Sequence, residues 1–238
     1  MPPTMKRAGP ANSLLAVITE FRALQRADLE DIGRRCQWRH AAAGEVVLHY
    51  QDGGDSIFFI IDGTIRLTHY SRSGHEVILG ELSAGDMFGE LAAIDGQRRS
   101  ATGVARTDTL LAVMPAAAFL DLIQTNHPIA MATLRRLSGQ VRRLTERVFD
   151  FSTLAVRNRI HAALLQLAKD PVTGSNQAII TPAPTHIDLA NMISTHREAV
   201  TRELNELVRD QLIRREEHSI VILDMARLRQ MVQAVRGW

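Results

Sequence analysis

Two short segments of this 238-residue sequence carry side chains that together could bind a small phosphate ester. The segment Gly85–Leu91 contains Gly89 and Glu90, and Arg99 with Ser100 begins nine residues after that glutamate. A glycine lets a ligand approach the backbone, a carboxylate accepts hydrogen bonds from a ribose, and an arginine fork clamps a phosphate. The set predicts a site for an anionic sugar phosphate, although a lone glutamate and arginine at this spacing usually form a surface ion pair.

A second cluster, nearer the C-terminus, has the pattern of two consecutive helix starts. Thr185–Asp188 and Thr195–Glu198 are each a capping box, in which a hydroxyl and a carboxylate satisfy free N–H groups. The short link between the two helices favours a helix-turn-helix. The buried face of the second helix is expected to comprise Val200, Leu204 and Leu207.

The opposite face of that second helix carries side chains of the kinds that can read base edges in DNA. Arginine can bond guanine at two atoms, and glutamate can accept from cytosine. The alternative is a pair of solvated helices with ordinary charge pairs, such as Glu198 with Arg202. The following segment, Leu212–Leu223, has the pattern of two strands around a polar turn, and such a wing favours DNA binding. The face comprises Arg197, Glu198, Thr201 and Arg202.

The residues around the first site follow a β pattern that would position it. From Ala43 to Met114, short runs rich in β-branched and aromatic residues alternate with glycine-containing turn signals. Closely spaced strands of this kind predict a small antiparallel barrel or jelly roll. The preceding segment, Leu14–Arg35, has the pattern of an amphipathic helix.

A narrow apolar stripe of heptad spacing lies between the two clusters. Its members fall at alternating intervals of three and four residues, flanked by arginines and a glutamate. Such a stripe must be buried, either on the barrel of its own chain or against the same helix of a second chain. Its narrowness and charged edges favour a parallel pairing with a second subunit. The stripe comprises Leu134, Leu137, Val141, Leu144, Val148 and Phe151.

Composition excludes several classes of protein but does not select a partner. The formal net charge of +2 is compatible with nucleic-acid binding without arguing for it. A single cysteine, Cys36, rules out a disulfide framework and any cysteine-rich metal site within one chain. We find no signal peptide and no apolar run of about 18 residues, and therefore expect a soluble protein of a reducing compartment.

Together these patterns predict an α+β protein with three parts. Residues 1–127 would form a sensor domain with a jelly-roll β-barrel, 128–152 a long dimerisation helix, and 153–238 a winged helix-turn-helix domain. The sequence resembles the cyclic-AMP receptor protein/FNR family of bacterial transcription regulators from Leu14 to Leu223. Phe88–Leu91 with Arg99–Ala101 looks like the family's phosphate-binding cassette, and Arg197–Arg202 looks like its recognition helix.

The resemblance implies a cyclic nucleotide as an allosteric ligand, either cyclic AMP or cyclic GMP or both, and no covalently bound cofactor. By this likeness, Glu90 holds the ribose 2′-hydroxyl, and Arg99 with Ser100 holds the cyclic phosphate. The expected ligand contacts are Gly89, Glu90, Leu91, Arg99, Ser100, Leu144 and Thr145.

The resemblance also implies a cytoplasmic homodimer that is not an enzyme and has no membrane partner. It would bind palindromic promoter DNA with half-sites similar to TGTGA, which Arg197, Glu198 and Arg202 would read. RNA polymerase is a further expected partner; activation of transcription is expected, and repression stays open. The expected DNA contacts are Thr185, His186, Thr195, His196, Arg197, Glu198, Thr201, Arg202 and His218.

Departures from the family pattern keep alternatives open. The family presents a Thr-Ser pair to the purine, whereas this sequence has Leu144 and Thr145, so the preferred base is not fixed. A regulator of the same fold that responds to another small molecule, or to none, is one alternative. A haem protein and a cupin-type metalloenzyme are others, which the scattered histidines and the lack of a His-x-His pair disfavour. The histidines considered are His40, His49, His69 and His75.

Overall fold

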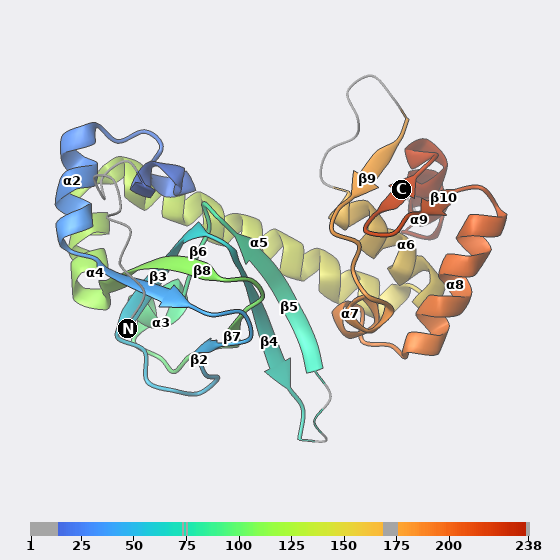
Figure 1. Cartoon of the computed structure of the whole chain (residues 1–238), viewed down its shortest axis with the longest axis horizontal. Coiled ribbons are helices and arrows are strands. Elements are labelled where there is room, and N and C mark those ends of the chain that lie inside the picture. Colours follow the sequence, from blue (N-terminus) through green and yellow to red (C-terminus); the bar gives the residue numbers. More distant parts are fainter. Residues whose placement is uncertain (1–13, 73, 75, 169–175, 237–238) are drawn as a thin grey trace, which may run out of the picture. The chain divides into compact units, whose positions relative to one another are not determined.

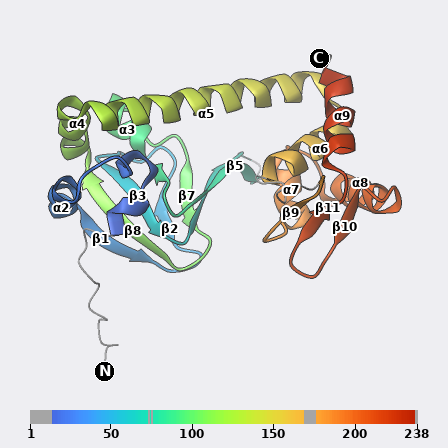
Figure 2. The ribbon, with the colours of Figure 1, turned by 90° about the horizontal axis from the view of Figure 1, so that it is seen from above.

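In the computed structural model, which describes residues 14–72, 74, 76–168 and 176–236, the chain divides into two compact units. One is built from residues up to 71 and from 78–139, and the other from 72–77 and from 140 onward. Helix α5, His127–Thr153, is a single unbroken helix that contributes residues to both units (Figure 1 and Figure 2). His75, one of the histidines considered as a metal or haem ligand, lies outside the described residues.

The first unit contains a jelly-roll sandwich of two four-stranded sheets, with strand orders β1-β8-β3-β6 and β2-β7-β4-β5 (Figure 1). The expected strands are confirmed, but among the described strands the two sheets stay separate, so the barrel is a sandwich and not a closed ring. The strands are β1 (Gln37–Ala41), β2 (Val46–Leu48), β3 (Ser56–Asp62), β4 (Thr64–Tyr70), β5 (Glu76–Ser83), β6 (Met87–Phe88), β7 (Thr102–Ala105) and β8 (Thr109–Pro115).

Alternation along strand β3 divides the core of this unit in two. Phe58 and Ile60 enter the layer between the sheets, where the ring of Phe58 stacks on that of Phe88 with centroids 4.9 Å apart. Phe59 faces the other way and packs against Phe21 of the N-terminal segment, with ring centroids 5.0 Å apart. Because both faces of β3 are buried, its sequence is continuously apolar.

The N-terminal segment is not the single helix that was expected over Leu14–Arg35. Ile18 is extended, with ψ of 126°, and a new helix begins only after Gln25, whose side chain forms a capping box with Asp28. The apolar residues that suggested one helix instead reach the core from separate short turns. The helical elements are the 3₁₀ turns η1 (Leu15–Val17) and η2 (Thr19–Phe21), and the helices α2 (Arg26–Arg34), α3 (Glu90–Asp95) and α4 (Ala116–Thr125).

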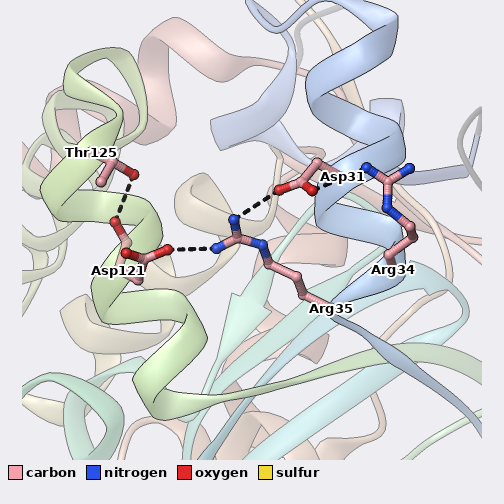
Figure 3. A network of polar contacts seen from close by, with 5 residues as sticks. All are labelled: Asp31, Arg34, Arg35, Asp121 and Thr125. Carbon is pink, nitrogen blue, oxygen red and sulfur yellow. Dashed lines mark hydrogen bonds and ion pairs between the residues drawn. The ribbon is translucent and has the colours of Figure 1, made fainter.

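A surface network joins α2 to α4 (Figure 3). Arg35 bonds Asp31 at 2.9 Å and Asp121 at 2.6 Å, so that one guanidinium connects the two helices. Arg34 donates to the second oxygen of Asp31 at 3.1 Å, and Thr125 donates to the backbone carbonyl of Asp121 at 2.8 Å. These exposed contacts fix the helices locally and contribute little to stability.

The second unit packs helices against a three-stranded antiparallel sheet of order β10-β11-β9 (Figure 2). The expected strand pair after the second helix is confirmed as β10 paired with β11. The elements are α6 (Val156–Leu167), β9 (Ala178–Ile180), α7 (His186–Met192), α8 (Arg197–Arg209), β10 (Ile213–Arg215), β11 (Ile220–Ile222) and α9 (Met225–Arg236). Within the described ranges, we find no helix that combines the length and apolar character needed to cross a bilayer.

Candidate functional site

The expected cassette lies where strand β6 meets helix α3. Gly89 stands between them with φ of +79°, in the left-handed region that favours glycine. A Cβ atom at Gly89 would lie 2.6 Å from Nη1 of Arg99 and 3.3 Å from the carbonyl oxygen of Ser56. Glycine is therefore required both by the backbone conformation and by the closeness of the arginine.

Arg99 is a buried cation, only 5% exposed. Its Nη1 donates to the carbonyl of Gly89 at 3.0 Å, and its Nη2 donates to the carbonyl of Ser56 at 2.8 Å. The guanidinium carbon lies 5.6 Å from the centre of the Phe58 ring. Two backbone carbonyls and one aromatic ring thus fix the direction of the guanidinium. The role of Ser56 could not be read from its residue type, because it acts through its backbone.

Burial and nearby carboxylates act on the charge of Arg99 in opposite directions. Burial is the largest influence and lowers the pKa of Arg99, while the charges of Asp55, Asp52 and Glu90 act in the opposite direction. The bonded partners of the guanidinium are neutral carbonyl oxygens, and they use only two of its N–H donors. A phosphate bound by the remaining donors would offset the cost of burying this charge.

The other expected ligand contacts differ in burial, and they do not all belong to the same unit. Glu90 is buried as the first residue of α3, so the structure brings together Gly89, Glu90 and Arg99. Ser100 and Leu91 are exposed beside them. The last two expected contacts, at positions 144 and 145, belong to the part of α5 in the second unit, where both side chains are exposed.

The first helix of the helix-turn-helix has the expected cap, and the second does not. The backbone N–H of Asp188 donates to Oγ1 of Thr185 at 3.1 Å at the start of α7. The cap of α8 is His196 and not Thr195, and His196 makes no side-chain capping bond. The backbone N–H of Thr195 instead donates to the carbonyl of Ala190 at 2.9 Å, which draws Thr195 into the turn.

Helix α8 has the two faces that its sequence predicts. Val200, Leu204 and Leu207 are fully buried, which confirms the expected core face. The outer face borders an open hollow of about 620 Å³. Asn205 and Arg209 on this face were not among the expected DNA contacts, although they continue the spacing of four from Thr201. The hollow is lined by Arg197, Glu198, Thr201, Arg202, Asn205 and Arg209.

His186 and Thr201 connect the two helices of this motif. Nδ1 of His186 lies 2.7 Å from Oγ1 of Thr201, and that hydroxyl donates to the carbonyl of Arg197 at 3.0 Å. Burial lowers the pKa of His186, and the charges of Arg215 and Arg197 lower it further. The cations around His186 make this corner of the motif electropositive.

A buried polar contact fixes the inner side of α8 on α6. Nε2 of His161, which is 0% exposed, lies 2.6 Å from Oε1 of Glu203, and Nε of Arg157 donates to the same oxygen at 3.1 Å. Burial lowers the pKa of His161, and the bond to Glu203 raises it in part. The sequence analysis missed this contact, although a glutamate on an otherwise apolar face was a visible signal.

The tip of the wing carries the last expected DNA contact. His218 and the neighbouring Glu217 are both strongly exposed. Glu216 accepts from Arg214 at 3.0 Å and from the hydroxyl of Ser219 at 2.8 Å, so the turn is closed by side chains as well as by backbone.

The heptad stripe is uncovered along much of α5. Leu134, Val141, Leu144 and Val148 are 55–66% exposed in the single chain. Large apolar side chains at helical spacing rarely stay in water on this scale. The stripe is thus an apolar surface that a further partner can cover.

The histidines do not form a metal site in the part of the chain that the structure describes. No three histidine, cysteine, aspartate or glutamate side chains there are grouped to hold an ion. His69 instead packs against the ring of Tyr50, with centroids 4.1 Å apart. Burial raises the pKa of the Cys36 thiol to about 12.

Comparison with known proteins identifies both units. Residues 38–126 match the cyclic nucleotide-binding domain family, and residues 158–231 match the Crp-like helix-turn-helix domain family. The cAMP-activated global transcriptional regulator Vfr of Pseudomonas aeruginosa is 26% identical over 198 residues, which cover 82% of this chain and 92% of Vfr. The cAMP-activated global transcriptional regulator CRP of Escherichia coli O157:H7 is 28% identical over 188 residues, which cover 79% of this chain and 90% of CRP.

A solved structure agrees with these matches. TTHA1359, a transcriptional regulator of the CRP/FNR family from Thermus thermophilus, aligns with a TM-score of 0.63 at 28% identity and covers 84% of this chain and 100% of that one. The two matched domains occur in the same order as a nucleotide-binding sandwich and a helix-turn-helix, and the relatives are transcription regulators and not enzymes. The chain therefore belongs to the cyclic-AMP receptor protein/FNR family of transcription regulators.

Proposed function

We propose that this protein is a homodimeric transcription regulator whose binding to a palindromic TGTGA-like DNA site is controlled by a cyclic nucleotide. The observation that carries the proposal is Arg99, a buried cation whose guanidinium bonds two neutral backbone carbonyls near the buried carboxylate of Glu90. A buried charge without a bonded counter-charge is costly, and an anionic ligand offsets that cost. The relatives Vfr and CRP are named as cAMP-activated, which supports the same class of ligand.

Within this proposal, the cassette holds the sugar phosphate end of the nucleotide. Glu90 accepts a hydrogen bond from the ribose 2′-hydroxyl, and Arg99 with Ser100 holds the cyclic phosphate. Gly89 and Leu91 line the approach. Leu144 and Thr145 face the purine with one hydroxyl, so cyclic AMP and cyclic GMP are both candidates.

The DNA contacts follow from the outer face of α8 and its neighbours. Arg197, Glu198 and Arg202 read base edges in the major groove, since they are exposed at the start of the helix. The remaining DNA contacts secure the motif on the duplex around them. They are Thr185, His186, Thr195, His196, Thr201 and His218.

The exposed stripe of α5 supports the homodimer. A second copy of the chain offers the same stripe, and parallel pairing would bury both. Two reading helices related by two-fold symmetry contact half-sites about 34 Å apart, one turn of DNA. The nucleotide favours one arrangement of the pair by binding it more tightly than the other. Such a dimer acts in the cytoplasm, where it would meet RNA polymerase at promoters.

The nucleotide is tested by isothermal titration calorimetry and by mobility shift on a TGTGA palindrome. Arg99→Ala should abolish nucleotide-dependent DNA binding, whereas Arg98→Ala should keep it, since Arg98 is exposed and its side chain donates to the carbonyl of Gln51. DNA binding by Arg99→Ala that still responds to nucleotide would contradict the mechanism. A native chain that gives heat with neither nucleotide would favour a different small molecule, or none.

A further inference from the structure

The loop before strand β3 holds Arg99 at both ends. The N–H of Arg99 donates to the carbonyl of Asp52 at 3.0 Å, and its carbonyl accepts from the N–H of Gln51 at 2.9 Å. The tip of the same side chain donates to the carbonyl of Ser56 at 2.8 Å. The loop between Asp52 and Ser56 therefore contacts Arg99 at its backbone and at its guanidinium.

Gly54 lies within this loop and directly against the arginine. A Cβ atom on Gly54 would lie 2.6 Å from Nε of Arg99, 2.7 Å from its Cζ, and 2.8 Å from Cβ of Ala92. Atoms at such separations overlap, so a neighbour would have to move. The guanidinium has little room to do so, because it is buried and bonded to two carbonyls. Ala92 has no flexible side chain that could turn away.

The same glycine controls the distance to helix α3. Ala92 lies in the first turn of α3, which begins with Glu90. The φ of Gly54 lies outside the left-handed region, so alanine would fit the backbone and only its Cβ would be in conflict. The preceding Gly53 has open space within 4 Å of a built Cβ and also lies outside that region, which makes it a matched control.

We propose that Gly54 is a positioning residue of the nucleotide site. The missing side chain lets the loop close over Arg99 and α3, and holds the guanidinium where its remaining donors meet the cyclic phosphate. The proposal rests on the cyclic-nucleotide function proposed above.

The first test compares nucleotide binding by the full-length native chain, Gly54→Ala and Gly53→Ala in calorimetric titrations with cyclic AMP and cyclic GMP. Gly54→Ala should bind the nucleotide about tenfold more weakly or worse, because a charge-assisted hydrogen bond to phosphate is misaligned. Gly53→Ala should stay within about twofold of the native chain. If Gly54→Ala binds the nucleotide within about twofold of the native chain, the proposed role of Gly54 is overturned, and the proposed function is not.

The second test separates an effect through Arg99 from a general weakening of the loop. Thermal melting without nucleotide is measured for the native chain, Gly54→Ala, Arg99→Ala and the double variant. Gly54→Ala should lower the melting temperature more in the native background than in the Arg99→Ala background, since two of the three overlapping atoms are then gone. If Gly54→Ala lowers the melting temperature equally in the native and Arg99→Ala backgrounds, the proposal is overturned. A native chain that gives heat with neither nucleotide overturns the proposed function itself, a result distinct from these.

Discussion

Replacing Val141 by aspartate tests whether the exposed stripe of α5 is the dimer seam. Val141 is 62% exposed in the single chain. Full burial of a valine side chain contributes about 1.5–3 kcal/mol, so covering its exposed part contributes about 1–2 kcal/mol. In a symmetric pair the loss occurs twice, which gives about 2–4 kcal/mol, or a dissociation constant raised roughly 30- to 700-fold. Facing carboxylates add to the effect in the same direction.

The assay is sedimentation equilibrium of the native chain and Val141→Asp over a range of protein concentrations. Val235→Asp is the matched control, because Val235 is 47% exposed on α9 and lies outside the stripe. Circular dichroism checks that both variants keep their helices. The reasoning is refuted if Val141→Asp dimerises within about threefold of the native chain, or if Val235→Asp weakens the dimer equally.

Two further changes test buried polar groups by urea unfolding. Glu203→Ala should lower the free energy of unfolding by about 3 kcal/mol, because it leaves the fully buried His161 without its carboxylate. Glu206→Ala, at a half-exposed carboxylate, should lower it by less than about 1 kcal/mol, and similar losses in the two variants would contradict the prediction. Burial raises the pKa of Glu20 above 4.5, so the native state binds its proton more tightly than the unfolded state does. The stability that this proton contributes is present below pH 4.5 and is lost as the pH rises through the raised pKa of Glu20 in the folded state. Glu20→Gln should therefore stabilise the chain near pH 7 and lose that advantage toward pH 4.5. A difference in the free energy of unfolding between Glu20→Gln and the native chain that stays the same at both pH values would contradict this prediction.

Much of the fold was predictable because its signals are local. The apolar run of β3 and the spacing of Val200, Leu204 and Leu207 are each a property of one element. The N-terminal segment was predicted wrongly for the same reason: Leu15, Ile18 and Phe21 have helical spacing, but they are buried from short turns. Periodicity shows that residues are buried together and does not show by which path they reach the core.

The candidate site was predictable only in part. The types and order of Gly89, Glu90 and Arg99 indicate phosphate binding, because each has a side-chain property suited to that chemistry. The cap at Thr195 was predicted wrongly, because its backbone N–H is used by the end of α7. The expected contacts with nucleotide and with base edges stay predictions.

The sequence by itself indicated the strands of the first unit, the candidate cassette residues, the two faces of α8 and the apolar stripe, since all of these depend on residues close together along the chain. Only the tertiary structure decided how Arg99 is held, because its acceptor in Ser56 lies 43 residues away and is a backbone atom common to every residue type. It also decided that Glu203 meets His161, 42 residues away. Contacts between distant segments depend on how the elements pack, and no local period records that.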